Sequence, residues 1–120
     1  PYKEAVLLVR GTLDPFDPRQ EEILTVSFND PPDYYDPRVR IVETTEELLK
    51  WLKRADRQGR PLYVIDGRVH KAARIYPELT ALVEREDLFS LVAFLPGFEP
   101  WLSIKVHRYR PGSRSALRNR

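Results

Sequence analysis

Three evenly spaced aspartates are the residues of this chain that come nearest to a chemical site. They lie in the segment SFNDPPDYYDPRVRIV (residues 27–42) and are Asp30, Asp33 and Asp36. Oxygen ligands at such short intervals can hold calcium or magnesium. However, the segment lacks the glycine that lets a calcium loop turn sharply, and its three prolines restrict how the carboxylates could converge. We therefore predict no metal site and interpret the segment mainly as a stiff connection.

The same segment is the best place to look for a polar ligand. It follows an apolar, β-branched run over residues 22–28 that is typical of a buried strand. Open α/β sheets bind ligands beyond the carboxyl ends of their parallel strands. The candidate ligand-binding residues are Asn29, Asp30, Asp33 and Tyr34, together with Asp66 at the end of another expected strand. In the alternative interpretation, Asn29 and Asp30 cap backbone groups and Asp66 belongs to an Asp-Gly turn.

Other common catalytic chemistries find little support. The chain has no cysteine, and its two histidines, His70 and His107, are not paired by spacing, so we expect both on the surface. No glycine-rich phosphate loop follows any strand. We therefore predict no catalytic residue and no cofactor in this chain.

A second group of residues could contact a partner or a membrane surface. Phe98 and Trp101 lie in a turn between two expected strands, and Arg108 and Arg110 open a basic C-terminal tail. Removing the five arginines of the last thirteen residues changes the formal charge from +2 to −3. Since the basicity is local, a nucleic-acid groove is not expected. We predict a disordered tail over 108–120.

The order of elements indicates one α/β domain over residues 1–107, with an extended lead-in over 1–21. Strands are expected over 22–28, 38–43, 60–67, 89–95 and 101–110. A helix should begin at a capping box of Thr44 and Glu47 and end at Gly59, and a second should begin at Pro77. This order favours a mainly parallel sheet of about five strands flanked by helices, Rossmann-like or flavodoxin-like, with the last two strands as an antiparallel hairpin.

Two expected faces follow from the spacing of apolar residues. On the first helix, Leu48, Leu49, Leu52 and Ala55 should face the core. In the last strand, Leu102, Ile104, Val106 and Arg108 should alternate with Ser103, Lys105 and His107. The chain begins at Pro1 and contains no methionine, so we expect it to be part of a longer protein. No window reaches the roughly 18 apolar residues of a membrane span.

Over residues 23–110 the segments resemble the soluble C-terminal domain of bacterial membrane glycosyltransferases of the protein mannosyltransferase and aminoarabinose transferase type. The resembling segments are ILTVSFNDPP, VRIVETTEELLKWL, GRPLYVIDG, YPELTALVEREDLFSLVAFLPG and IKVHRYRPG. The resemblance implies a parent enzyme with many transmembrane helices that takes sugar from a polyprenyl-phosphate donor. In that family the catalytic acid lies in an early extracytoplasmic loop, before this region, so no catalytic role is carried over to any residue here.

By this resemblance the chain is a non-catalytic accessory domain outside the bacterial cytoplasmic membrane. Its partners would be the transmembrane portion of the same parent chain, and also the membrane surface or the acceptor substrate. Two alternatives remain open: a stand-alone interaction module, and a small ligand-binding domain that uses the loop over residues 29–36.

Overall fold

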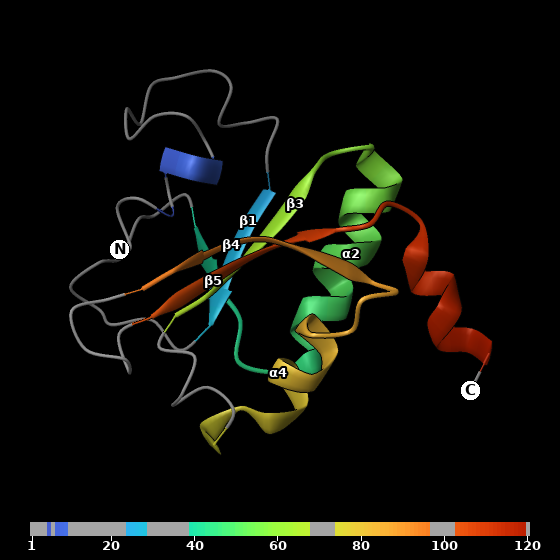
Figure 1. Ribbon diagram of the computed structural model, residues 1–120. Coiled ribbons are helices and arrows are strands. Elements are labelled where there is room, and N and C mark those ends of the chain that lie inside the picture. The colour runs from blue at the N-terminus through green and yellow to red at the C-terminus, as the bar shows by residue number, and fades with distance from the viewer. Residues whose placement is uncertain are drawn as a thin grey trace.

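A computed structural model describes residue 5 and residues 7–9, 24–28, 39–67, 74–96 and 103–119 (Figure 1). The elements are β1 (Leu24–Phe28), β2 (Arg40–Ile41), α2 (Thr45–Gln58), β3 (Leu62–Asp66), α4 (Pro77–Val83), β4 (Phe89–Leu95), β5 (Ile104–Tyr109) and the 3₁₀-helix η4 (Ser113–Asn119).

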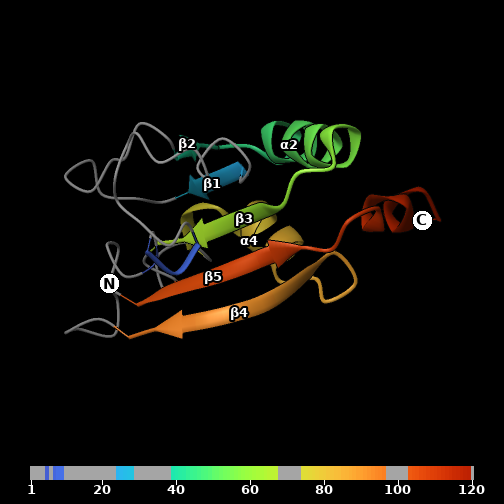
Figure 2. The same ribbon diagram turned by 90° about the horizontal axis from the view of Figure 1, so that it is seen from above.

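The five strands form one mixed sheet in the order β2-β1-β3-β5-β4. Strand β1 is parallel to β2 and β3, whereas β5 is antiparallel to both β3 and β4 (Figure 2). The α/β class and the antiparallel last pair are confirmed. The prediction of a mainly parallel sheet is wrong, because half of the strand pairings are antiparallel.

The reason lies in the position of β5. Strands β3 and β4 run in the same direction and are connected through α4, as a βαβ crossover requires, but they are not neighbours. The chain reverses after β4, and β5 then occupies the place between β3 and β4. Local sequence patterns give strand direction in such a unit but not strand order.

Helix α2 is defined by local signals at both ends. The Thr44 Oγ1 atom accepts a hydrogen bond from the Glu47 backbone N–H at 3.1 Å, which is the predicted capping box. At the other end Gly59 adopts the left-handed conformation with φ of 62°. Leu48, Leu52 and Ala55 are buried as predicted, whereas Leu49 is 37% exposed at the edge of the apolar face.

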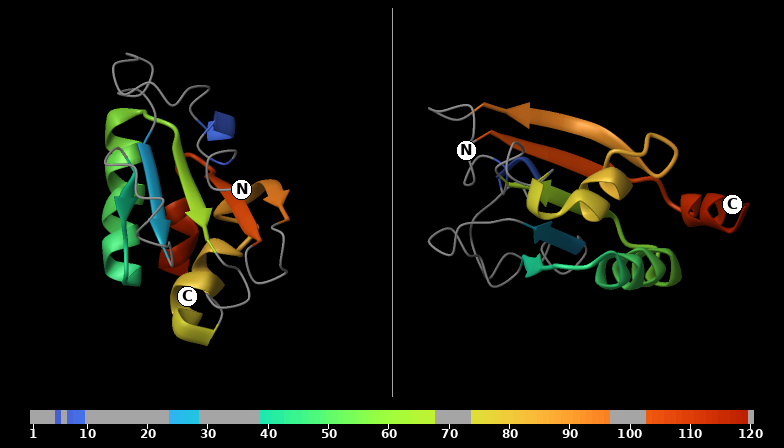
Figure 3. Two further views of the ribbon diagram at one scale, coloured as in Figure 1. Left: turned by 90° about the vertical axis from the view of Figure 1, so that its left-hand side faces the viewer. Right: turned by 90° about the horizontal axis from the view of Figure 1, so that it is seen from below.

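The two described helices α2 and α4 lie on the same side of the sheet (Figure 3). Their apolar residues join those of β1 and β3 in one core cluster, which includes Phe28, Leu52 and Val64. A smaller cluster on the other face contains Ile65, Ile104 and Val106 together with Ala5 and Val9. Residues 7–9 are helical, so the expectation of an extended lead-in is wrong for these residues; Val9 packs against the sheet, whereas Leu7 and Leu8 are exposed.

The last strand is buried on both faces. Ile104 and Val106 are buried, as predicted, but His107 and Tyr109 on the opposite face are also only 4% and 2% exposed. The prediction that His107 lies on the surface is therefore wrong, and Arg108 is exposed rather than inward. The physical reason is that both faces of β5 are covered, by the smaller cluster on the side of Ile104 and by the main cluster on the side of Tyr109.

Residues 108–119 also differ from the disordered tail expected for 108–120. Arg108 and Tyr109 complete β5, and η4 follows over Ser113–Asn119. Leu117 packs against the main core cluster. Apolar contacts and the hydrogen bonds described below hold this segment, although its composition is basic.

Candidate functional site

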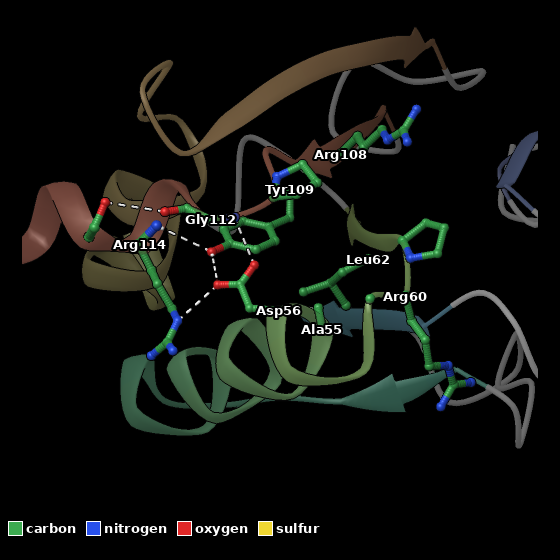
Figure 4. Close-up of a pocket in the computed structure, with 12 residues that line it drawn as sticks. Ala55, Asp56, Arg60, Leu62, Arg108, Tyr109, Gly112 and Arg114 are labelled. Carbon is green, nitrogen blue, oxygen red and sulfur yellow. Dashed lines mark hydrogen bonds and ion pairs between the residues drawn. The ribbon is translucent and has the colours of Figure 1, made fainter.

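A cavity of about 680 Å³ lies where α2 ends, β3 begins and the chain passes from β5 into η4 (Figure 4). Its volume falls in the range of small-molecule sites. Ala55 and Leu62 form an apolar part of the lining, and Tyr109 places its ring beside them. Arg60 and Arg114 lie at opposite ends of the view in Figure 4.

The Asp56 carboxylate is the centre of a hydrogen-bond network in this cavity. Its Oδ2 atom accepts a hydrogen bond from the Tyr109 hydroxyl at 2.8 Å and another from Arg114 Nε at 2.8 Å. Its Oδ1 atom accepts the Gly112 backbone N–H at 2.7 Å. The Tyr109 oxygen in turn accepts the Arg114 backbone N–H at 3.2 Å. Because one carboxylate receives three donors, it joins α2 to the segment that leads into η4.

These hydrogen bonds form a joint between α2 and residues 109–114, and burial favours them. The Asp56 side chain is only 16% exposed and that of Arg114 is 33% exposed, so water competes weakly for the carboxylate. Burial, assisted by the hydrogen bond to Asp56, raises the pKa of Tyr109 to about 12. The tyrosine therefore stays a neutral donor at neutral pH, and it is not poised to act as a base.

The arginines around the cavity do not converge on one point. The Arg108 guanidinium lies 5.8 Å from the centre of the Tyr63 ring, and in Figure 4 it points away from Asp56. Arg60 Nη1 donates to Gln58 Oε1 at 3.0 Å, while Arg114 is paired with Asp56. The cavity thus offers apolar walls and separate guanidinium groups, which suit packing better than the tight binding of one anion.

A second polar feature is His107, which sequence reasoning had placed on the surface. Desolvation by burial, reinforced by the charge of Lys105 and opposed by that of Glu84, lowers its pKa to about 4. Within the described parts of the chain, its buried Nε2 atom has no hydrogen-bond partner. Lys105 Nζ pairs with Glu84 Oε1 at 3.1 Å beside it. The imidazole is therefore neutral at pH 7 and packs edge-on against Phe89.

The predicted ligand loop and the predicted contact turn lie outside the described residues. They contain Asn29, Asp30, Asp33 and Tyr34, and Phe98 and Trp101, and His70 lies outside the described residues as well. Asp66 is described and is 1% exposed, at the end of β3 beside Phe28 of β1. Thus it lies at the carboxyl ends of two parallel strands, as predicted, but its side chain is buried.

Both arginines that were predicted to contact a partner are described, and they make different contacts within the fold. Arg108 is exposed over the Tyr63 ring, as given above. Arg110 donates its Nε to the Glu86 backbone oxygen at 2.7 Å and its backbone N–H to the Leu88 oxygen at 2.8 Å. Arg110 therefore braces the turn that leads into β4.

The sequence did contain one signal for the joint at Asp56. An acid near the end of a helix interacts unfavourably with the helix dipole, so Asp56, three residues before Gly59, needs a compensating partner. That signal indicates a contact without saying that Tyr109, Gly112 and Arg114 provide it.

Among the described residues, no group of three or more histidine and acidic side chains is arranged to hold a metal ion. In the same residues, no helix is long and apolar enough to cross a membrane. Comparison of this chain with known proteins gives no matching family model, no matching curated protein and no matching solved structure.

Proposed function

We propose that this chain is a non-catalytic accessory domain of a polytopic membrane glycosyltransferase that uses a polyprenyl-phosphate sugar donor. The domain would sit on the extracytoplasmic face of the bacterial cytoplasmic membrane, with the transmembrane portion of its parent chain as its partner. In support, the five segments that carry the family resemblance include the residues of β1, β2, β3, α4, β4 and β5 and the first part of α2. The resemblance thus extends over the folded framework.

The observation that carries the proposal is that the Asp56 carboxylate is taken up by structural hydrogen bonds. This carboxylate accepts three hydrogen bonds from residues 109–114 and is thereby occupied in joining two parts of the fold. The neighbouring Tyr109 is kept neutral by its raised pKa, and the buried His107 is kept neutral by its lowered pKa. These three partly or fully buried polar groups therefore support shape rather than reaction, as an accessory domain requires.

The gene that encodes the chain provides the first test. We expect it to encode many apolar spans of about 20 residues before this domain, with an acidic residue in the first outer loop. A gene without such spans would overturn the proposal and would leave the two alternatives, a stand-alone interaction module and a small ligand-binding domain that uses the loop over residues 29–36.

The second test uses the parent enzyme. Asp56→Ala should release the C-terminal segment, making the domain sensitive to protease and lowering transfer of sugar to the acceptor. Asp87→Ala provides the matched control, because Asp87 is a 47% exposed acid paired with Arg85. Full transferase activity from a parent whose domain has become protease-sensitive would show that the domain is dispensable, against the proposal.

A further inference from the structure

The outer face of helix α2 carries a stripe of basic side chains. Four of them follow the helical spacing i, i+3, i+4 and i+7, which places them on one face of the helix. All four are exposed, and they are Lys50, Lys53, Arg54 and Arg57. They lie opposite the buried side of α2, because the residues that face the core occupy positions 48, 52 and 55. These four residues form what we call the α2 basic stripe.

The charge of the α2 basic stripe is not neutralised within the described part of the chain. None of its four residues has an ion-pair partner among the described residues. The only acid between residues 50 and 60 is Asp56, and its carboxylate is already paired with Arg114, as Figure 4 shows. The four positive charges are therefore available to a partner outside the domain.

Positive charge is concentrated where α2 meets the C-terminal segment. Residues 50–60 carry five basic side chains and one acid, a net charge of +4, and residues 108–120 carry five arginines and no acid, a net charge of +5. The hydrogen bond between Arg114 and Asp56 joins these two segments in space. Since the whole chain has a net charge of +2, its remaining residues carry −7. The region around α2 is thus strongly basic, although the chain as a whole is nearly neutral.

Two features of the stripe indicate the chemistry of its partner. Its charges are spread along α2, so they match a surface with many anionic groups better than one phosphate. Apolar side chains also flank it: Leu49 is 37% exposed on one side, and Trp51 lies partly buried on the other. The Arg54 guanidinium lies 5.0 Å from the centre of the Trp51 ring, so the tryptophan borders the stripe. Basic residues beside tryptophan and leucine are typical of helices that contact lipid headgroups, whereas a nucleic-acid duplex presents phosphates without an apolar layer beneath them.

We propose that the α2 basic stripe docks on a surface of anionic phospholipid, with Leu49 and Trp51 at the level of the headgroups. The inference deepens the proposed function and rests on it for its setting, because a membrane-spanning parent would hold the domain close to lipid. Clusters of four or more basic residues on an amphipathic helix bind anionic headgroups, and each residue strengthens binding about 5-fold. Helix α2 would then lie parallel to the lipid surface, with the sheet behind it.

The first test measures binding of the 120-residue chain to sedimented vesicles. We expect binding to equal parts of phosphatidylcholine and phosphatidylglycerol, and at least about 10-fold weaker binding to phosphatidylcholine alone. Lys53→Gln together with Arg57→Gln should weaken binding about 25-fold, since two contributions of about 5-fold multiply. The matched control is Arg40→Gln together with Arg74→Gln, which removes the same charge from exposed residues outside α2 and should weaken binding less than about 3-fold. Thermal melting checks that both double variants are folded.

Three results would overturn the proposal. The first is a wild type that does not bind the anionic vesicles at low salt. The second is an equal loss of affinity in the two double variants, which would assign binding to net charge rather than to α2. The third is tighter binding to a short DNA duplex than to the vesicles at equal phosphate concentration, which would indicate a nucleic-acid partner. The gene test given above is decided separately, so failure of the docking surface and failure of the proposed function are distinguishable.

A second test keeps every charge in place. The chain has no cysteine, so Leu49→Cys and Leu8→Cys each introduce one site for a fluorescent label. Leu49 lies beside the stripe, whereas Leu8 is exposed on the segment that packs against the other face of the sheet. We expect anionic vesicles to reduce acrylamide quenching of the label at position 49 at least about 2-fold, because groups at the headgroup level are shielded from water. The label at position 8 should be unaffected. Equal protection of both labels, or of neither, would refute docking through α2.

Discussion

Replacing Asp56 with alanine tests how the C-terminal segment is held on α2. The substitution removes the acceptor of three hydrogen bonds, from the Tyr109 hydroxyl, the Gly112 backbone N–H and Arg114 Nε. It leaves the Tyr109 hydroxyl oxygen accepting the Arg114 backbone N–H but removes the acceptor of the hydroxyl's own proton. The expected result is that η4 detaches or that the domain unfolds more easily.

The size of the effect follows from the burial of each partner. Hydrogen bonds to a charged acceptor contribute about 1.5 kcal/mol each at the low end of their range, and two of the three donors here are uncharged. The pair with Arg114, whose side chain is a third exposed, adds about 0.5 kcal/mol after screening by solvent. Removing the Asp56 charge also removes its unfavourable interaction with the dipole of α2, which restores about 0.5 kcal/mol of stability. The free energy of unfolding should therefore fall by about 3 kcal/mol.

Urea unfolding followed by circular dichroism measures this change. Asp87→Ala is the control, and because the Asp87 side chain is 47% exposed its loss should stay within about 0.5 kcal/mol. If Asp56→Ala loses less than about 1 kcal/mol, the carboxylate does not hold the two parts together, and the reasoning is refuted.

Three further predictions concern single residues. The pKa of His107 is about 4 in the folded chain and about 6.5 when unfolded, so the unfolded state binds more protons between these values and stability falls as the pH is lowered. Between pH 7.5 and pH 5 the free energy of unfolding should fall by about 2 kcal/mol. Urea titrations at the two pH values should show that His107→Phe removes most of this fall. An unchanged fall in the variant would contradict the prediction. Gly59→Ala forces a side chain into the left-handed region at φ of 62° and should cost about 1 kcal/mol in the same titrations, with Gly59→Asn costing less; equal stability of all three proteins would count against the strain. Thr44→Ala removes the acceptor for the Glu47 N–H and should lower the melting temperature by an amount equivalent to about 1 kcal/mol, whereas Thr44→Ser should not.

Helix α2 shows what the sequence predicts well. Its first residues are set by the capping box of Thr44 and Glu47, and its end is set by the positive φ of Gly59. Both signals act within a few residues, so they can be recognised without knowledge of the fold. The strands β1, β3 and β4 were found in the same way, from short apolar runs.

The joint at Asp56 shows what the sequence cannot predict. Its three hydrogen bonds connect residues that are 53, 56 and 58 positions apart, and no local pattern specifies such partners. The burial of His107 has the same origin. The alternation along β5 was recognised, but whether both of its faces are covered depends on the place of β5 within the sheet. The ligand loop over residues 29–36 stays a prediction.

The interior position of β5 has a consequence for folding. Strand β1 pairs with β2 and β3 without help from later residues, whereas β4 finds its only described neighbour in β5. During synthesis the apolar strand β4 must therefore wait unpaired until residues 104–109 leave the ribosome. Pairing of β3 with β5 also closes a loop of about 40 residues, as Asp66 pairs with Lys105, and such long-range contacts form slowly. The interval between the emergence of β4 and that of β5 is thus the time at which this chain is most exposed to aggregation.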